Sequence, residues 1–475
     1  MAEHRGRRRP PRPAARPGRG PGRWPVLLAG RALSGIVALA VLGTTGFTWY
    51  GYQSLTSGLT TSSALDQVRQ DAPKKLDGSV NLLLIGLDSR KAMDGSDLPG
   101  QFVQDELHAG SSSNVGGYNT NSLILLHIPA NGGKVEAVSI PRDDYVMTYN
   151  GDGSQQGMHK IKEAYGNAKS KVTPALQAKG LKGAALEQAG RDAGRAATIE
   201  TLQKFLDVPI DHFAEINLVG FYDIAQVVQP ITVCLNADTK DPAEEGQGSG
   251  ADFHQGLNRL NASQALSFVR QRHNLHGGDF DRTHRQQAFI SAVEYKLRQD
   301  GLFGDLGKMQ QLFDAVKKDV VIDDKWNILD FAQEAPDLTG GNVEFITLPV
   351  KALTPRVVIP DDGAQPVDVN WVDPAVNQRV VKAMFGYADA DRPPGATATA
   401  TATPAPASPS APSSPPTSAP SHSAKPGRGT PTPTASPDPA ATTGGTAAPA
   451  PSDPASSVPM QGPPVQASQG IPCVD

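Results

Sequence analysis

The chain has 475 residues, of which 38% are hydrophobic, and it is rich in glycine (48) and proline (41). This composition excludes a chain that folds along its whole length into packed domains. The formal net charge is −4, but residues 1–24 contribute +7, which leaves −11 for the remainder and argues against a broad nucleic-acid-binding face.

A basic head, residues 1–25, precedes an apolar stretch in residues 26–52. Its segment Ala32–Tyr50 has 19 residues and no charge, which is long enough to span a bilayer core at 1.5 Å per residue, and aromatic residues follow at its end. We therefore expect one transmembrane helix in the cell membrane, with the head in the cytoplasm and the rest extracellular. The alternative is a cleaved signal peptide, although no clean Ala-x-Ala site follows.

Polar residues 53–79 are interpreted as a stalk, and a folded domain is expected over residues 80–391. Three apolar, β-rich runs bounded by turn residues predict buried strands at Val80–Leu87, Ser122–Pro129 and Lys134–Pro141. Further strands are predicted at His212–Leu218, Ile231–Asn236 and Val343–Val350. Helices are predicted at Ile161–Lys169, Ala184–Leu206, Val219–Val228, Ala262–Phe268, Arg282–Arg298, Gly307–Lys318 and Trp326–Glu334. This mixture indicates an α/β fold, a three-layer α/β/α sandwich with a central mixed sheet.

Residues 392–475 are dominated by Pro, Ala, Ser and Thr, so we expect a disordered tail. The chain has two cysteines, Cys234 in a predicted strand and Cys473 near the end of this tail. An extracellular location permits a disulfide that would attach the tail to the domain. Alternatively, Cys234 is a small buried hydrophobic residue.

The segment Ala265–Gln287 concentrates basic and acidic side chains, namely Arg270, Arg272, Arg282 and Arg285 with Asp279 and Asp281. Guanidinium groups bind phosphate oxygens in a bidentate fork, so the cluster suggests a polyanionic ligand, although many charge clusters are solvated faces. On the predicted helix, Arg282 and Arg285 share one face. Arg270 and Arg272 share a face only if that segment is extended, which we predict.

Other polar residues follow the predicted strands. Asp88 and Arg90 come after the first strand and Arg142 after the third, while Lys160 precedes a helix. Open α/β sheets place ligand sites at the ends of their strands. We therefore expect these residues to converge with the arginine cluster on one phosphate-rich ligand and a divalent cation.

The motifs NLLLIGLDSR, TNSLILLHIPANGGKVEAVSIPRDDYV, KIKEAYGNA and GLNRLNASQALSFVRQRH, followed by GDFDRTHRQQ, resemble the LytR-CpsA-Psr family over roughly residues 80–350. The Pro/Ala-rich tail is similar to that of high-GC, actinobacterial members. The resemblance implies a membrane-anchored phosphotransferase that moves a glycopolymer such as teichoic acid from a polyprenyl-pyrophosphate carrier onto peptidoglycan, with Mg²⁺.

The resemblance also implies residue roles. Mg²⁺ would be held by Asp88 and, where the family usually has a second aspartate, by the neutral Asn121. Pyrophosphate would be bound by Arg90, Arg142, Lys160, Arg270, Arg272, Arg282, Arg285 and Gln286. The catalytic residues would be Arg142, Arg270, Arg272 and Asp279. Asp281 stands where a glycine is common, and it could supply the missing carboxylate or pair with an arginine.

Three alternatives stay open. His273, His276, Asp279, Asp281 and His284 have the residue types of a transition-metal site, which would indicate a metallohydrolase acting on phosphate esters. The chain could also be a lipid-pyrophosphate hydrolase, or an envelope-binding or regulatory anchor that grips lipid-linked polymer without transferring it. An apolar groove for the polyprenyl chain would be lined by Phe213, Leu218, Phe221 and Phe289, although such residues are more often plain core.

Overall fold

The fold is described from a computed structural model. It covers residues 59–75, 77–108, 117–130, 132–243, 248–301, 317–327, 343–358, 366–387, 465–466 and 471–475, together with the single residues 307, 312 and 314. Among these residues, no helix has the length and apolar character needed to cross a membrane. The predicted membrane helix at 26–52, most of the helices predicted between 307 and 334, and most of the predicted tail lie outside the described residues.

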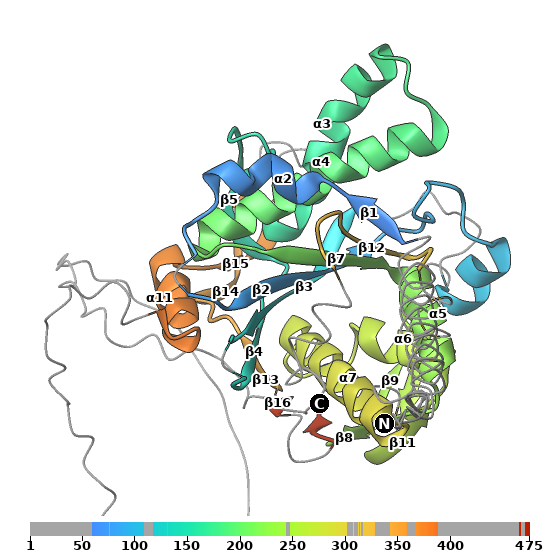
Figure 1. The fold of residues 1–475 in the computed structure, drawn as a ribbon. Coiled ribbons are helices and arrows are strands. Elements are labelled where there is room, and N and C mark those ends of the chain that lie inside the picture. Colours follow the sequence, from blue (N-terminus) through green and yellow to red (C-terminus); the bar gives the residue numbers. More distant parts are fainter. Residues whose placement is uncertain are drawn as a thin grey trace, which may run out of the picture. The chain divides into compact units, whose positions relative to one another are not determined.

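The described part of the chain is organised around an eight-stranded mixed sheet with the order β1-β12-β7-β2-β3-β4-β13-β16 (Figure 1). The strands are β1 (Thr60–Ser62), β2 (Val80–Asp88), β3 (Asn119–Ile128), β4 (Val135–Ser139), β7 (His212–Asn217), β12 (Val320–Asp323), β13 (Val343–Thr347) and β16 (Val465–Gln466). β2 pairs antiparallel with β3 and parallel with β7. The mixed α/β class with a central mixed sheet is therefore confirmed.

Helices cover both faces of this sheet (Figure 1). On one face lie α2 (Ala64–Val68), α4 (Gly183–Leu206) and α11 (Pro374–Met384), and on the other lie α5 (Leu218–Val228), α6 (Ala262–Arg270) and α7 (Asp279–Gln299). Because side chains alternate along a strand, Leu83 and Ile85 of β2 pack on the first face, whereas Leu82 and Leu84 pack on the second. The apolar runs are thus buried on both sides, as predicted.

Smaller elements complete the domain. α3 (Ala164–Ala178) packs against α4, and a short π-helical turn spans Phe102–Glu106. A four-stranded sheet has the order β14-β15-β5-β6, from β14 (Ala352–Val358), β15 (Pro366–Trp371), β5 (Asp144–Tyr149) and β6 (Gln155–Lys160). A hairpin pairs β9 (Thr239–Asp241) with β10 (Ala251–Phe253), and a three-stranded sheet joins β11 (Gly256–Leu260), β8 (Ile231–Leu235) and β17 (Cys473–Val474).

The domain begins earlier than predicted. β1 pairs in parallel with β12 at one edge of the main sheet, and Leu65 and Val68 of α2 are buried in the core beside α4. Residues 60–68 are therefore part of the domain, and the prediction of a stalk over 53–79 is wrong for them. Elements of three and five residues are too short for their hydrophobic pattern to show that they belong to the folded domain.

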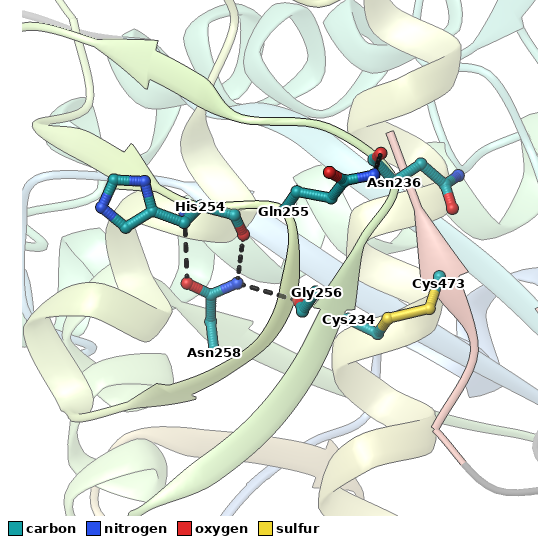
Figure 2. Close-up of a disulfide and its surroundings, with 7 residues drawn as sticks. All are labelled: Cys234, Asn236, His254, Gln255, Gly256, Asn258 and Cys473. Carbon is teal, nitrogen blue, oxygen red and sulfur yellow. Dashed lines mark hydrogen bonds between the residues drawn. A yellow bond between two sulfur atoms is a disulfide. The ribbon is translucent and has the colours of Figure 1, made fainter.

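The end of the chain returns to the domain, so the predicted tail is wrong for its last residues. β17 runs parallel to β8 with Cys473 opposite Cys234, and the two cysteines form a disulfide with their Cα atoms 4.3 Å apart (Figure 2). Arg285 on α7 donates from Nε to the main-chain oxygen of Asp475 at 2.7 Å. Both contacts attach the C-terminus to the layer that contains α7.

We predict that replacing both Cys234 and Cys473 by serine lowers the free energy of unfolding by about 2–4 kcal/mol, because the disulfide closes a long loop in the unfolded chain. Urea unfolding of the wild type and the double variant measures this difference. A reducing agent should destabilise the wild type and leave the double variant unchanged. Equal stability of the two proteins under oxidising conditions would contradict the prediction.

Candidate functional site

Polar side chains from separate segments meet at one edge of the main sheet. Asp88 ends β2, and Asn121 lies on the antiparallel neighbour β3. The Asn121 amide bridges two charged groups, because its Nδ2 donates to Asp88 Oδ2 at 2.6 Å and its Oδ1 accepts from Arg142 Nη1 at 2.8 Å. The structure thus brings these three predicted residues together where neighbouring strand ends meet.

The first turn of α7 adds an acidic and a basic residue to this row. α7 starts after Gly278, whose φ of +59° is a conformation that glycine adopts readily. Asp279 Oδ1 lies 3.0 Å from Arg142 Nη2 and 2.9 Å from Arg282 Nη2. An aspartate in the first turn is also favoured by the helix dipole. Asp279 therefore orients two arginines and is not a free carboxylate.

Positive charge at this edge is only partly neutralised. Two buried arginine nitrogens have no partner, namely Nη1 of Arg90 and Nε of Arg282, and Nε of Arg142 has only the Asp143 carboxylate at 3.3 Å. Burial and the nearby Arg142 lower the pKa of Arg282 to about 9, and burial lowers the pKa of Arg270 to about 10. Guanidinium groups still remain protonated at neutral pH. A bound anion would supply both the missing acceptors and the missing charge.

The Arg270–Arg272 segment differs from the prediction. Arg270 is the last residue of α6, which continues two residues beyond the predicted end at Phe268. The prediction of an extended conformation is therefore wrong at Arg270. Gln271 leaves the helix with φ −52° and ψ 135°, and both arginines line the same cavity.

That cavity has a volume of about 750 Å³ and lies between the sheet and helices α5, α6 and α7. The residues of its polar end include Asp88, Arg90, Asn121, Ser122, Arg270, Arg272, Arg282 and Gln286. Its apolar walls include Leu84, Ile124, Leu218, Phe221, Ile224, Leu266, Val269, Phe289, Ile290 and Val293. An apolar interior with a cationic end suits an amphiphile that has an anionic head.

Three of the four residues predicted for an apolar groove line this cavity, namely Leu218, Phe221 and Phe289. Phe213 does not line it, because it packs in the core on the opposite face of the sheet. Its neighbours on β7, Ala214 and Ile216, line the cavity instead. Consecutive side chains in a strand point to opposite faces of the sheet, which separates Phe213 from Ala214.

Arg285 is not brought to the cavity. It is 1% exposed, and its Nη1 donates to Gln271 Oε1 at 2.6 Å while its Nε holds the C-terminal main chain. Its guanidinium also lies over the Phe268 ring at 5.2 Å. Arg285 therefore joins α7 to α6 and to the C-terminus, and it does not have the geometry of an anion ligand.

Lys160 does not line the cavity, and it is connected to the site through Asp143. Its Nζ is 3.7 Å from Asp143 Oδ1, and Lys162 Nζ donates to the same oxygen at 2.6 Å. Arg142 Nε is 3.3 Å from Asp143 Oδ2. Burial opposes the effect, but these cations lower the pKa of Asp143. The sequence interpretation missed Lys162, although its position two residues after Lys160 was a usable signal.

Gln286 is placed at the polar end by contacts with two elements. Its Oε1 accepts from Ser122 Oγ at 2.9 Å, and its Nε2 donates to the main-chain oxygen of Val269 at 3.4 Å. Ser122 was also missed, although it follows Asn121 directly. Gln286 thus ties α7 to β3 and to the end of α6 beside the arginines.

The alternative transition-metal site is wrong. In the described ranges, no group of three or more His, Cys, Asp or Glu side chains could hold a metal ion. Asp281 accepts from the main-chain nitrogen of Gly277 at 2.5 Å, and Asp279 is paired with two arginines. Asp281 therefore does not replace a second carboxylate near Asp88.

Comparisons with known proteins add independent information. The LytR_cpsA_psr family model matches residues 47–368. The chain is 36% identical over 282 residues to the cell wall biosynthesis protein LcpA of Corynebacterium glutamicum, a match that covers 58% of this chain and 51% of that protein. It is 25% identical over 302 residues to the polyisoprenyl-teichoic acid–peptidoglycan teichoic acid transferase TagU of Bacillus subtilis, covering 62% and 78%. The match thus spans about half the length of the Corynebacterium protein.

Among solved structures, a Streptococcus agalactiae protein is similar with a TM-score of 0.47 and 18% identity, covering 69% of this chain and 91% of that one. Bacillus subtilis TagV is similar with a TM-score of 0.43 and 18% identity, covering 66% and 99%.

We predict that Arg282→Gln weakens binding of inorganic pyrophosphate roughly 10- to 100-fold, since a charged hydrogen bond contributes about 1.5–3 kcal/mol. Isothermal titration calorimetry measures the affinity. Arg259→Gln, which changes an exposed arginine on β11, is the matched control and should bind like the wild type. Equal affinities of all three proteins would remove Arg282 from the anion site.

Proposed function

Because the chain belongs to the LytR_cpsA_psr family, we propose that it transfers a glycopolymer from a polyprenyl-pyrophosphate carrier onto peptidoglycan during cell-wall assembly. The observation that carries this proposal is the cavity with apolar walls and an arginine-rich end. A polyprenyl chain would lie along the walls, and its pyrophosphate would lie at the arginines. The names of two relatives, a cell wall biosynthesis protein and a teichoic acid transferase, support the same reaction class.

The arrangement suits phosphoryl transfer, which requires charge neutralisation and in-line positioning and little covalent work from the protein. Arg272 and Arg282 would bind the phosphate oxygens. Arg142 would do so from an orientation fixed by Asn121 and Asp279. A peptidoglycan hydroxyl would then attack the phosphorus that carries the glycopolymer, and polyprenyl monophosphate would leave.

The residues at the polar end fit a Mg²⁺ ion in part. Asp88 offers a carboxylate, but the Asn121 oxygen is occupied by Arg142 and its nitrogen faces Asp88. If the Asn121 amide were flipped, its oxygen would face the Asp88 carboxylate, and its nitrogen would face the Arg142 guanidinium. The first contact would pair two acceptors and the second two donors. We therefore propose that Asp88 would hold Mg²⁺ and that Asn121 is not a direct ligand. When bound, the ion would neutralise charge on the phosphate oxygens.

We also propose that residues 26–52 anchor the chain in the cell membrane, with the N-terminus in the cytoplasm and the domain outside. The disulfide supports this orientation, since disulfides persist in oxidising, extracytoplasmic compartments. A lipid-linked donor is itself confined to the membrane, so an anchored enzyme would remain within reach of it.

The proposal is tested with the full-length chain in detergent, a lipid-pyrophosphate-linked polymer and peptidoglycan fragments. Polymer should become attached to peptidoglycan while lipid monophosphate is released, and both should require the acceptor. Release of lipid monophosphate without an acceptor would favour a hydrolase. Donor binding without turnover would favour a non-catalytic anchor.

We predict that Arg272→Ala lowers kcat for transfer about 10²- to 10³-fold, because its side chain would stabilise charge that develops on the phosphate oxygens. The main-chain nitrogen of Arg272 would keep its 3.2 Å bond to Asp241, so folding should be preserved. Transfer kinetics measure the effect, with Arg259→Ala as the control. A variant with wild-type kcat would place Arg272 outside the site.

We predict that Asn121→Asp increases the affinity for Mg²⁺, because it would put a second carboxylate beside Asp88 in place of the amide. Titration with Mg²⁺, or with Mn²⁺ followed by electron paramagnetic resonance, measures this in the absence of any donor. Asp252→Asn, an exposed change on β10, should leave the affinity unaltered. Unchanged binding in Asn121→Asp would show that this position is remote from the cation.

A further inference from the structure

A histidine and a carboxylate form a pair at the cavity, directly beside Arg272. Asp241 ends β9 and is 1% exposed. Its Oδ1 lies 2.8 Å from His273 Nδ1, and both residues line the cavity. His273 follows Arg272 in sequence, so the imidazole and an arginine of the cationic end belong to one short segment.

The carboxylate of Asp241 is held in a fixed orientation. Its Oδ2 accepts from the main-chain nitrogens of Arg272 and Ser249, each at 3.2 Å. Burial opposes the effect, but the bonds from His273, Arg272 and Ser249 lower the pKa of Asp241. An ionised carboxylate accepts hydrogen bonds and donates none, so Nδ1 of His273 has the proton, and in the neutral ring Nε2 is the acceptor.

The imidazole is placed to meet an incoming molecule. The His273 side chain is 58% exposed, although its partner Asp241 is buried. Two main-chain donors already fix Asp241. The β9–β10 hairpin therefore stays attached to the Arg272 segment without the histidine. The pair therefore combines an accessible proton acceptor with a rigid orienting group, an arrangement suited to general base catalysis.

The carboxylates of the site are already engaged by other partners. Asp279 is paired with Arg142 and Arg282. Glu215 accepts from Arg195 at 3.0 and 2.8 Å and is completely buried.

Asp88 is the proposed cation ligand and already accepts from Asn121. Among the described residues that line the cavity, His273 is the one imidazole.

We propose that His273 is the general base of the transfer reaction and that Asp241 is its positioning residue, an inference that rests on the proposed function. A bond forms between the peptidoglycan hydroxyl oxygen and the phosphorus that carries the glycopolymer. The bond from that phosphorus to the bridging oxygen breaks, and polyprenyl monophosphate leaves with the electron pair. The hydroxyl proton passes to Nε2 of His273 and from there to solvent, while Arg272 faces the phosphate charge.

The test measures transfer by the full-length chain in four forms: wild type, His273→Ala, Asp241→Asn and His254→Ala. His254 is the matched control, because it also faces an aspartate, Asp238 at 3.8 Å, but is 86% exposed and does not line the cavity. Its turn is held by the Asn258 side chain and does not need the His254 ring (Figure 2).

We expect His273→Ala to lower kcat about 10²- to 10⁴-fold, with the KM for the lipid donor unchanged, because a base acts in the transition state. Added imidazole should restore part of this rate, since the vacated place is open to solvent. Asp241→Asn should lower kcat with the donor KM unchanged, and circular dichroism should verify its fold. His254→Ala should match the wild type.

The inference is overturned if His273→Ala keeps the wild-type kcat, or if its lost activity is not restored by imidazole and its donor KM rises. Either result would leave the ring with a structural or binding role. Failure of the proposed function looks different, because the wild type would then show no acceptor-dependent transfer at all.

Discussion

Positive charge buried without enough counter-charge is the constraint around which this domain is arranged. Burying a guanidinium group in a low-dielectric site costs free energy unless hydrogen-bond acceptors and negative charges surround it. The protein supplies a part of these through Asp279, Asp143 and the Asn121 oxygen. Nη1 of Arg90 and Nε of Arg282 remain without partners, and the cavity beside them has apolar walls. A ligand with a polyanionic head and a hydrocarbon body satisfies both conditions at once.

The elements that could be predicted from the sequence are those that repeat a pattern over many residues. The apolar runs of β2, β3 and β4 and the long helix α4 agree with prediction because each has a hydrophobic period or a continuous buried run. The convergence of Asp88 and Arg142 was predictable too, because strand ends in one sheet lie at a common edge.

What could not be predicted depends on partners that are distant in sequence. Arg282 and Arg285 are three residues apart on one helix, yet one faces the cavity and the other holds Asp475. The contact of Arg285 depends on where the C-terminal strand β17 lies, and no local sequence pattern encodes that position. The Asp241–His273 pair likewise depends on how the β9–β10 hairpin folds over the end of α6. The strands β1, β9 and β17 have two or three residues each and leave no periodic signal.

The disulfide at the end of the chain changes how the Pro-rich segment should be regarded. Because Cys473 is bonded to Cys234 within the domain, the residues between α11 and β17 are joined to the same folded body at both ends. A protease that cuts this segment once would produce two fragments that stay covalently linked until the disulfide is reduced. The contact of Asp475 with Arg285 would survive such a cut, so proteolysis of this segment would leave the layer beneath the cavity in place.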